Sequence, residues 1–185
     1  APYENEIDDY LQTHYQLFYN HQFNNYWKAT AAVFLTRGKG YYEQYKAAAA
    51  LSSYGLPNYI NGTDTIRETD IVRRLWLDNH FYGSIFSVQH QKNKTQFTIG
   101  GGWTQYDGKH FGSIIWAKEQ AAVPVNHRWY NLTAHKTDLN IYSKWTQQLS
   151  NQLQSFVDLQ LRNAQYRING FRDNPALFVN NSYTF

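Results

Sequence analysis

Alternation of apolar and polar side chains with a period of two constrains this 185-residue chain more than any other feature. It is clearest between Tyr82 and Trp103, where the pattern places Lys92-Asn93 as the two-residue turn of a β-hairpin. One face of this hairpin is then apolar and the other is polar or small, and a slip of one residue in one strand would mix the two. The predicted pairs on the apolar face include Val88 with Phe97, Phe86 with Ile99 and Tyr82 with Trp103.

Two further segments follow the same pattern. Between Tyr10 and Arg37, a three-residue loop at Phe23–Asn25 pairs Leu17 with Ala31 and Tyr15 with Val33. Between Thr137 and Asn163, a turn at Ser150–Gln152 pairs Trp145 with Val157 and Ile141 with Leu161. On the other face of this third hairpin, Lys144 lies across from Asp158, and opposite charges at such a position stabilise a strand pair.

The three hairpins predict an all-β chain, an antiparallel meander of about six long strands that forms one unit over residues 1–185. Three short turns lie at one end, and two long connections, at about residues 38–70 and 107–126, lie at the other. This asymmetry is typical of outer-membrane barrels, whose long loops are extracellular. A soluble β-sandwich also alternates. Strands of about ten residues, with one face rich in Gln, Asn, Lys and Asp, favour a barrel with a wet lumen.

Composition and motifs exclude several classes of function. Charged residues are only 17% of the chain, below the usual quarter of a soluble domain, while aromatic residues are 18%. Cys is absent, which excludes disulfides and Cys-ligated metals, and the scattered Lys and Arg residues give no sign of a nucleic-acid partner. The chain has no His-Glu-x-x-His, Gly-x-Ser-x-Gly or phosphate-loop motif, and Gly100–Gly102 lacks the spacing of a dinucleotide fingerprint. We therefore expect no enzyme, no cofactor and no metal site.

Four segments, in order along the chain, resemble the TonB-dependent outer-membrane receptors. The first is a strand-to-loop segment in that family, and the ordered set is more specific than any one member. The segments are Phe34–Lys46 (FLTRGKGYYEQYK), Arg73–Gly83 (RRLWLDNHFYG), Gly100–Gly112 (GGGWTQYDGKHFG) and Val157–Arg162 (VDLQLR).

The resemblance implies a location in the bacterial outer membrane and a 22-stranded transmembrane β-barrel that is filled by an N-terminal plug domain. Such receptors import a scarce ligand: a siderophore, a vitamin or metal complex, or an oligosaccharide. The implied partners are the remainder of the same receptor barrel and its plug domain, TonB through an N-terminal region missing from this chain, outer-membrane lipid and the transported small ligand. A passive porin-type channel and a soluble carbohydrate-binding β-sandwich are the alternatives.

Candidate site residues follow from the predicted strands and connections. Aromatic and His side chains in or beside the long connections could stack on a ligand or equally pack the loops together; they are Tyr41, Tyr42, Tyr45, Trp76, His110 and Trp116. Lys144 and Asp158 are the expected lumen salt bridge. The predicted lipid-facing residues are Leu17, Val33, Leu35, Phe86, Val88, Phe97, Ile99, Ile141, Leu159 and Leu161.

Overall fold

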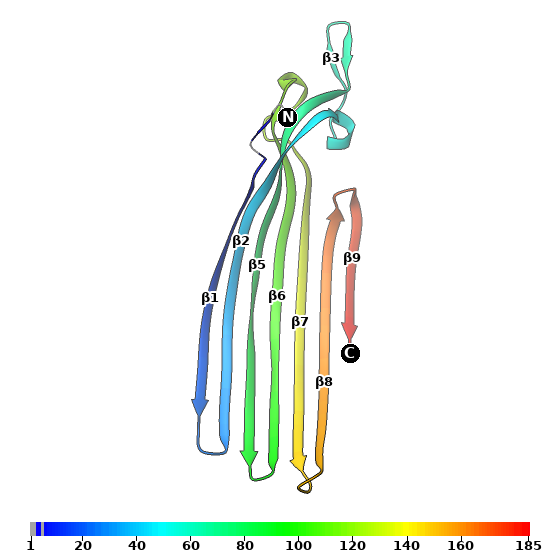
Figure 1. The fold of residues 1–185 in the computed structure, drawn as a ribbon. Coiled ribbons are helices and arrows are strands. Elements are labelled where there is room, and N and C mark those ends of the chain that lie inside the picture. Colours follow the sequence, from blue (N-terminus) through cyan, green and yellow to red (C-terminus); the bar gives the residue numbers. More distant parts are fainter. Residues whose placement is uncertain (1–2, 5) are drawn as a thin grey trace.

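A computed structural model describes residues 3–4 and 6–185, and strands make up 79% of it, which confirms the all-β prediction. Seven strands form one antiparallel sheet in the order β1-β2-β5-β6-β7-β8-β9, and β3 and β4 form a separate two-stranded ribbon (Figure 1). Within the main sheet every strand pairs with the next along the chain, so the sheet is a meander. It is a single layer (Figure 1).

The strands of the main sheet are much longer than the five or six residues usual in globular proteins. Their bounds are β1 Asp8–Gln22, β2 Trp27–Ala50, β5 Glu68–Lys92, β6 Thr95–Ala117, β7 Arg128–Gln148, β8 Gln154–Phe171 and β9 Asn174–Thr184. The ribbon strands are β3 Tyr59–Asn61 and β4 Asp64–Ile66, and two short 3-10 helices are η1 Leu51–Tyr54 and η2 Gln120–Ala122. No helix among the described residues is long and apolar enough to cross a membrane.

The register of the third hairpin is confirmed, whereas the other two are shifted. In β7 and β8, Trp145 pairs with Val157, Ile141 with Leu161 and Lys144 with Asp158, as predicted. In β5 and β6, Val88 pairs with Ile99 rather than Phe97, because the turn lies at Asn93-Lys94 instead of Lys92-Asn93. In β1 and β2, Leu17 pairs with Val33 rather than Ala31. Both shifts are two residues, so every side chain stays on its predicted face.

Turn chemistry explains the two shifts. Asn93 adopts a positive φ of 53°, which suits asparagine at the first position of a tight hairpin turn, and this moves the turn by one residue. In the first hairpin, the side-chain oxygen of Asn24 accepts hydrogen bonds from the backbone N–H groups of Tyr26 and Trp27. This Asx-type turn lengthens the loop to the four residues Phe23–Tyr26.

The long connections are shorter than predicted because the strands continue through much of the expected loop residues. β2 pairs with β5 in unbroken register as far as Lys46, so the connection predicted at about 38–70 is reduced to 51–67. The second, predicted at about 107–126, is reduced to 118–127. Residues 38–50 and 107–117, predicted to belong to these connections, lie instead in strands. A seventh strand, β9, also exceeds the predicted six.

The two long connections pack against each other at one end of the sheet, opposite the short turns (Figure 1). Their small core includes Leu51, Ile71 and Ile114, which are almost fully buried. His127 of the second connection lies 2.7 Å from the carbonyl oxygen of Tyr54 in the first. We call this end of the molecule the tip.

Candidate functional site

The strand registers divide the main sheet into two faces, because residues paired in an antiparallel ladder point to the same side. Face A carries Leu17, Val33 and Phe86, and face B carries Phe18, Ala32 and Ile85. All ten residues predicted to face lipid lie on face A: Leu17, Val33, Leu35, Phe86, Val88, Phe97, Ile99, Ile141, Leu159 and Leu161. Leu17 and Leu159 there are 69% and 67% exposed, so face A presents a broad apolar surface.

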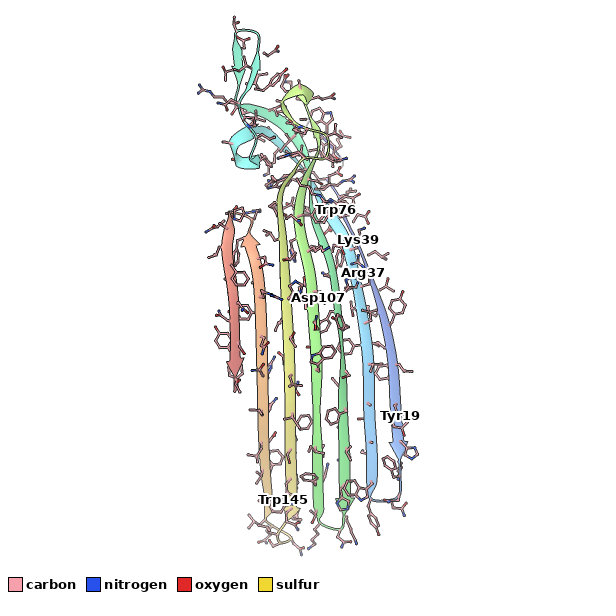
Figure 2. The ribbon with its side chains drawn as sticks, turned by 180° about the vertical axis from the view of Figure 1, so that it is seen from behind. Tyr19, Arg37, Lys39, Trp76, Asp107 and Trp145 are labelled. Carbon is pink, nitrogen blue, oxygen red and sulfur yellow. The ribbon has the colours of Figure 1, made fainter. Side chains whose placement is uncertain are left out.

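An uncharged band crosses face A on five neighbouring strands. In each strand a stretch of nine residues places no Asp, Glu, Lys or Arg on this face: 27–35, 82–90, 97–105, 137–145 and 157–165. Nine residues of strand span about 30 Å along the chain. Trp145 lies at the short-turn end of this band, and Tyr19 on the neighbouring strand β1 lies near its mid-height, beside Ala31 (Figure 2).

The uncharged band ends abruptly on its tip side. The next paired row consists of five ionisable side chains on five strands, and the row above it adds three more. We call these eight residues the ionic rim: Arg37, His80, Asp107, His135 and Arg167 in the first row, and Lys39, Asp78 and Lys109 in the second. The labelled members Asp107, Arg37 and Lys39 lie between the short-turn end and Trp76 in Figure 2. The rim could not be predicted from the sequence, because its residues form rows only in the true registers of the strands.

Ion pairs and hydrogen bonds join members of the rim. A guanidinium nitrogen of Arg37 lies 2.6 Å from a carboxylate oxygen of Asp78. His135 Nδ1 lies 2.6 Å from Asp107, which also accepts a hydrogen bond from the Tyr82 hydroxyl. Lys39 and Lys109 flank Asp78 on the two neighbouring strands and are exposed. The second row therefore has more positive than negative charge.

Face B carries polar pairs at the height of the uncharged band. The Lys144 ammonium lies 3.5 Å from Asp158, so these paired residues form a salt bridge on face B. A tighter pair was not predicted: Asp138 accepts hydrogen bonds from Arg162 Nε at 3.0 Å and from its terminal nitrogen at 2.6 Å. The side chain of Asp138 is only 11% exposed. These ion pairs give face B charged groups at the height where face A has none, although face B also exposes Phe18, Ile85 and Phe156.

The two salt bridges on face B are expected to differ in strength. We expect Asp138→Asn to lower the free energy of unfolding by about 1–2 kcal/mol, because a bidentate and mostly buried carboxylate is lost while the half-exposed Arg162 regains water. Asp158→Asn should cost less than about 1 kcal/mol, since both partners are well exposed. Urea unfolding of the two variants measures the difference, and equal costs would contradict this ranking.

Aromatic rings lie over glycines on face B. The Tyr142 ring covers Gly100, where a Cβ atom would come within 2.5 Å of the Tyr142 hydroxyl. Trp129 and Tyr130 cover Gly112 in the same way. Gly100–Gly102 lies inside β6, as expected from its sequence context. These rings occupy the space where the strand lacks side chains, so a larger residue at Gly100 or Gly112 would displace them.

The six candidate ligand-binding residues separate into three groups. Tyr41 and Trp76 contact each other on face A with ring centroids 4.7 Å apart. Phe111 extends this row, stacked 5.6 Å from Trp76, and the guanidinium groups of Arg74 and Arg128 lie over Tyr41 and Phe111. The sequence did not lead us to Phe111, Arg74 or Arg128. Pairing the strands in the correct register would have placed them beside Trp76 and Tyr41.

The second and third groups line separate hollows near the tip. Tyr45 and Trp116 share a paired row with Val72 and line a hollow with Asp70, whose pKa is lowered by hydrogen bonds from the Ala48 backbone and the Tyr45 hydroxyl. Tyr42 and His110 belong to face B. They line a hollow of about 500 Å³ with Asp8, Tyr10, Leu75, Leu77 and Tyr130, and Tyr41 and Trp76 of the first group also border it.

The hollow on face B suits an aromatic ligand group, because its lining is mainly aromatic and aliphatic, with the Asp8 carboxylate as its charged member. Burial lowers the pKa of His110 from its ordinary value, so the neutral imidazole is favoured, and the Tyr106 hydroxyl lies 3.3 Å from its Nε2 atom. Four tyrosine side chains in the wall offer rings for stacking and hydroxyl groups for hydrogen bonds. Among the described residues no group of three or more His, Asp or Glu side chains is arranged to hold a metal ion.

Comparison with known proteins does not identify a family. No protein-family model matches this chain, and no curated protein matches it.

Proposed function

We propose that this chain is a segment of the wall of an outer-membrane β-barrel, with face A toward lipid and face B toward the lumen. The observation that carries the proposal is the uncharged band, which spans nine residues on each of five strands and ends at a row of five ionisable residues. A membrane-crossing strand needs about 9–11 residues at a tilt near 45°. At that tilt, about 30 Å of strand gives a band a little over 20 Å tall, close to the roughly 25 Å of outer-membrane barrels.

The two ends of the sheet also support this orientation. Three short turns lie at one end. At the other lie the two long connections and the short turn between β8 and β9, and 12 to 15 further residues of each of β2, β5 and β6 extend there beyond the band. Outer-membrane barrels have short periplasmic turns and long extracellular loops. We therefore place the tip outside the cell. The salt bridges and glycine-backed rings of face B suit a hydrated lumen that a plug domain can occupy.

The specific activity we propose is ligand import by a TonB-dependent receptor. This rests on the four ordered segments of the resemblance, and on a sheet that ends in two edge strands, β1 and β9, as a piece of a larger barrel would. The rest of the barrel, a plug domain and TonB would be its partners, and a siderophore, a vitamin or metal complex, or an oligosaccharide its cargo. The hollow lined by Tyr42 and His110 faces the proposed lumen near its outer mouth and is our candidate contact with that cargo.

Spin labels on two adjacent residues test the orientation. Phe97 lies on face A and Thr98 on face B, so in a membrane-reconstituted protein a label at Phe97 should collide more often with a lipid-soluble relaxation agent. A label at Thr98 should respond more to a water-soluble agent. The reverse result would mean that the faces are inverted, and equal access to the water-soluble agent at both positions would contradict a membrane location.

A second experiment separates a TonB-dependent receptor from a passive porin. The gene that encodes this chain should also encode a plug domain, and uptake of the cargo should stop when the tonB gene is deleted. Uptake that persists without TonB would favour the porin.

A further inference from the structure

We propose that the ionic rim binds the phosphate group of an anionic lipid in the outer leaflet, with the acyl chains lying on the uncharged band below it. The inference rests on the proposed membrane orientation. Beyond that orientation, the inference assigns a specific lipid contact to Lys39 and Lys109 on the second row of the rim.

The charges of the second row leave these two lysines available. Asp78 lies between them on β5, but its carboxylate is held at 2.6 Å by Arg37 from the neighbouring row. Neither lysine forms a salt bridge with any described residue, and both are exposed. With His neutral, the whole rim holds four cations (Arg37, Lys39, Lys109 and Arg167) and two carboxylates (Asp78 and Asp107), which leaves a net charge of +2 (four minus two).

The spacing suits one phosphate group. Lys39 and Lys109 lie on strands separated only by β5, so their backbones are about 10 Å apart. Each lysine has a flexible four-carbon stem that lets its ammonium group move several ångströms. Both ammonium groups can therefore converge over Asp78 on a phosphate, which two positive charges bind more strongly than one.

The height of the rim selects a lipid rather than a soluble anion. The second row lies two paired rows beyond the end of the uncharged band, about 13 Å along the strand or roughly 10 Å in height at a tilt near 45°. This is the depth of the headgroup region beside a hydrocarbon core. Leu35 on β2, and Trp103 farther down β6, lie below the two lysines on the same face, where acyl chains would run.

Tryptophan quenching in nanodiscs tests the proposal with the full-length protein. The discs contain phosphatidylcholine with either brominated phosphatidic acid or brominated phosphatidylcholine as a minor component. We expect the brominated phosphatidic acid to quench more strongly, because it accumulates beside Trp103. Lys39→Gln with Lys109→Gln should weaken this preference about thirtyfold, since a lysine near an anionic surface contributes about 1 kcal/mol and each 1.4 kcal/mol is a factor of ten.

Lys28→Gln with Lys136→Gln is the matched control, because it removes the same charge from exposed lysines on face B. This control should keep the preference, and millimolar inorganic phosphate should not abolish it.

Equal quenching by the two brominated lipids, a preference that survives in the Lys39 and Lys109 variant, or displacement by inorganic phosphate would each overturn the proposal. Quenching by brominated phosphatidylcholine is independent of the rim. Absence of quenching by brominated phosphatidylcholine would instead contradict the membrane orientation. If every variant retains this quenching, the variants are folded.

Discussion

Phe86→Arg is expected to destabilise the membrane-embedded protein by about 2–4 kcal/mol, the cost of a basic side chain at the bilayer midplane of a β-barrel. Phe86 is the central residue of the uncharged stretch 82–90 on β5 and is 47% exposed. The penalty arises because a guanidinium group placed among acyl chains loses its water without gaining a partner. Reversible unfolding by guanidinium chloride in lipid vesicles measures it.

Ile85→Arg is the matched control for this prediction. Ile85 is the adjacent residue, also apolar and 51% exposed, but it lies on face B. An arginine there would face the proposed hydrated lumen and should cost less than about 1 kcal/mol. If Ile85→Arg is the more costly of the two, face B is the lipid side. Two small and equal costs would show that neither face meets lipid, as in a soluble β-sandwich.

The second large effect is that residues 1–185 expressed alone should not form a folded monomer in detergent or lipid. The main sheet ends in β1 and β9, and neither outer edge pairs with another described strand. In lipid each unsatisfied backbone group costs several kcal/mol, so the lipid-facing part of the two edges costs on the order of ten kcal/mol or more. Strands from the remainder of a barrel would satisfy these groups.

Native mass spectrometry after refolding in detergent tests this expectation. We expect aggregates or mixed oligomers, while the same segment inside the complete barrel should be protected from proteases. A compact, protease-resistant species of 21.8 kDa with no other polypeptide would show that the chain closes on itself, and the larger barrel would then be wrong.

Alternation alone predicted the all-β fold, the antiparallel hairpins and the shared face of the ten residues that we expect to meet lipid. Alternation is sufficient for this because, within one strand, the face of a side chain depends only on whether its residue number is odd or even. The same property limits it: pairing Val88 with Phe97 or with Ile99 preserves the apolar face equally well. Asn93 at positive φ and the Asn24 side-chain hydrogen bonds decided between such registers, and these turn effects act over only a few residues.

Features that depend on several strands required the tertiary structure. Arg37, Asp107 and Arg167 are far apart in the sequence, and they form one row only when four successive strand pairings are each correct. The same holds for the row of Tyr41, Trp76 and Phe111. Local pattern specifies which side of a strand a residue occupies, because that is set by the backbone of its own strand. Its height relative to residues on other strands depends on the sum of all intervening registers, which only the assembled sheet determines.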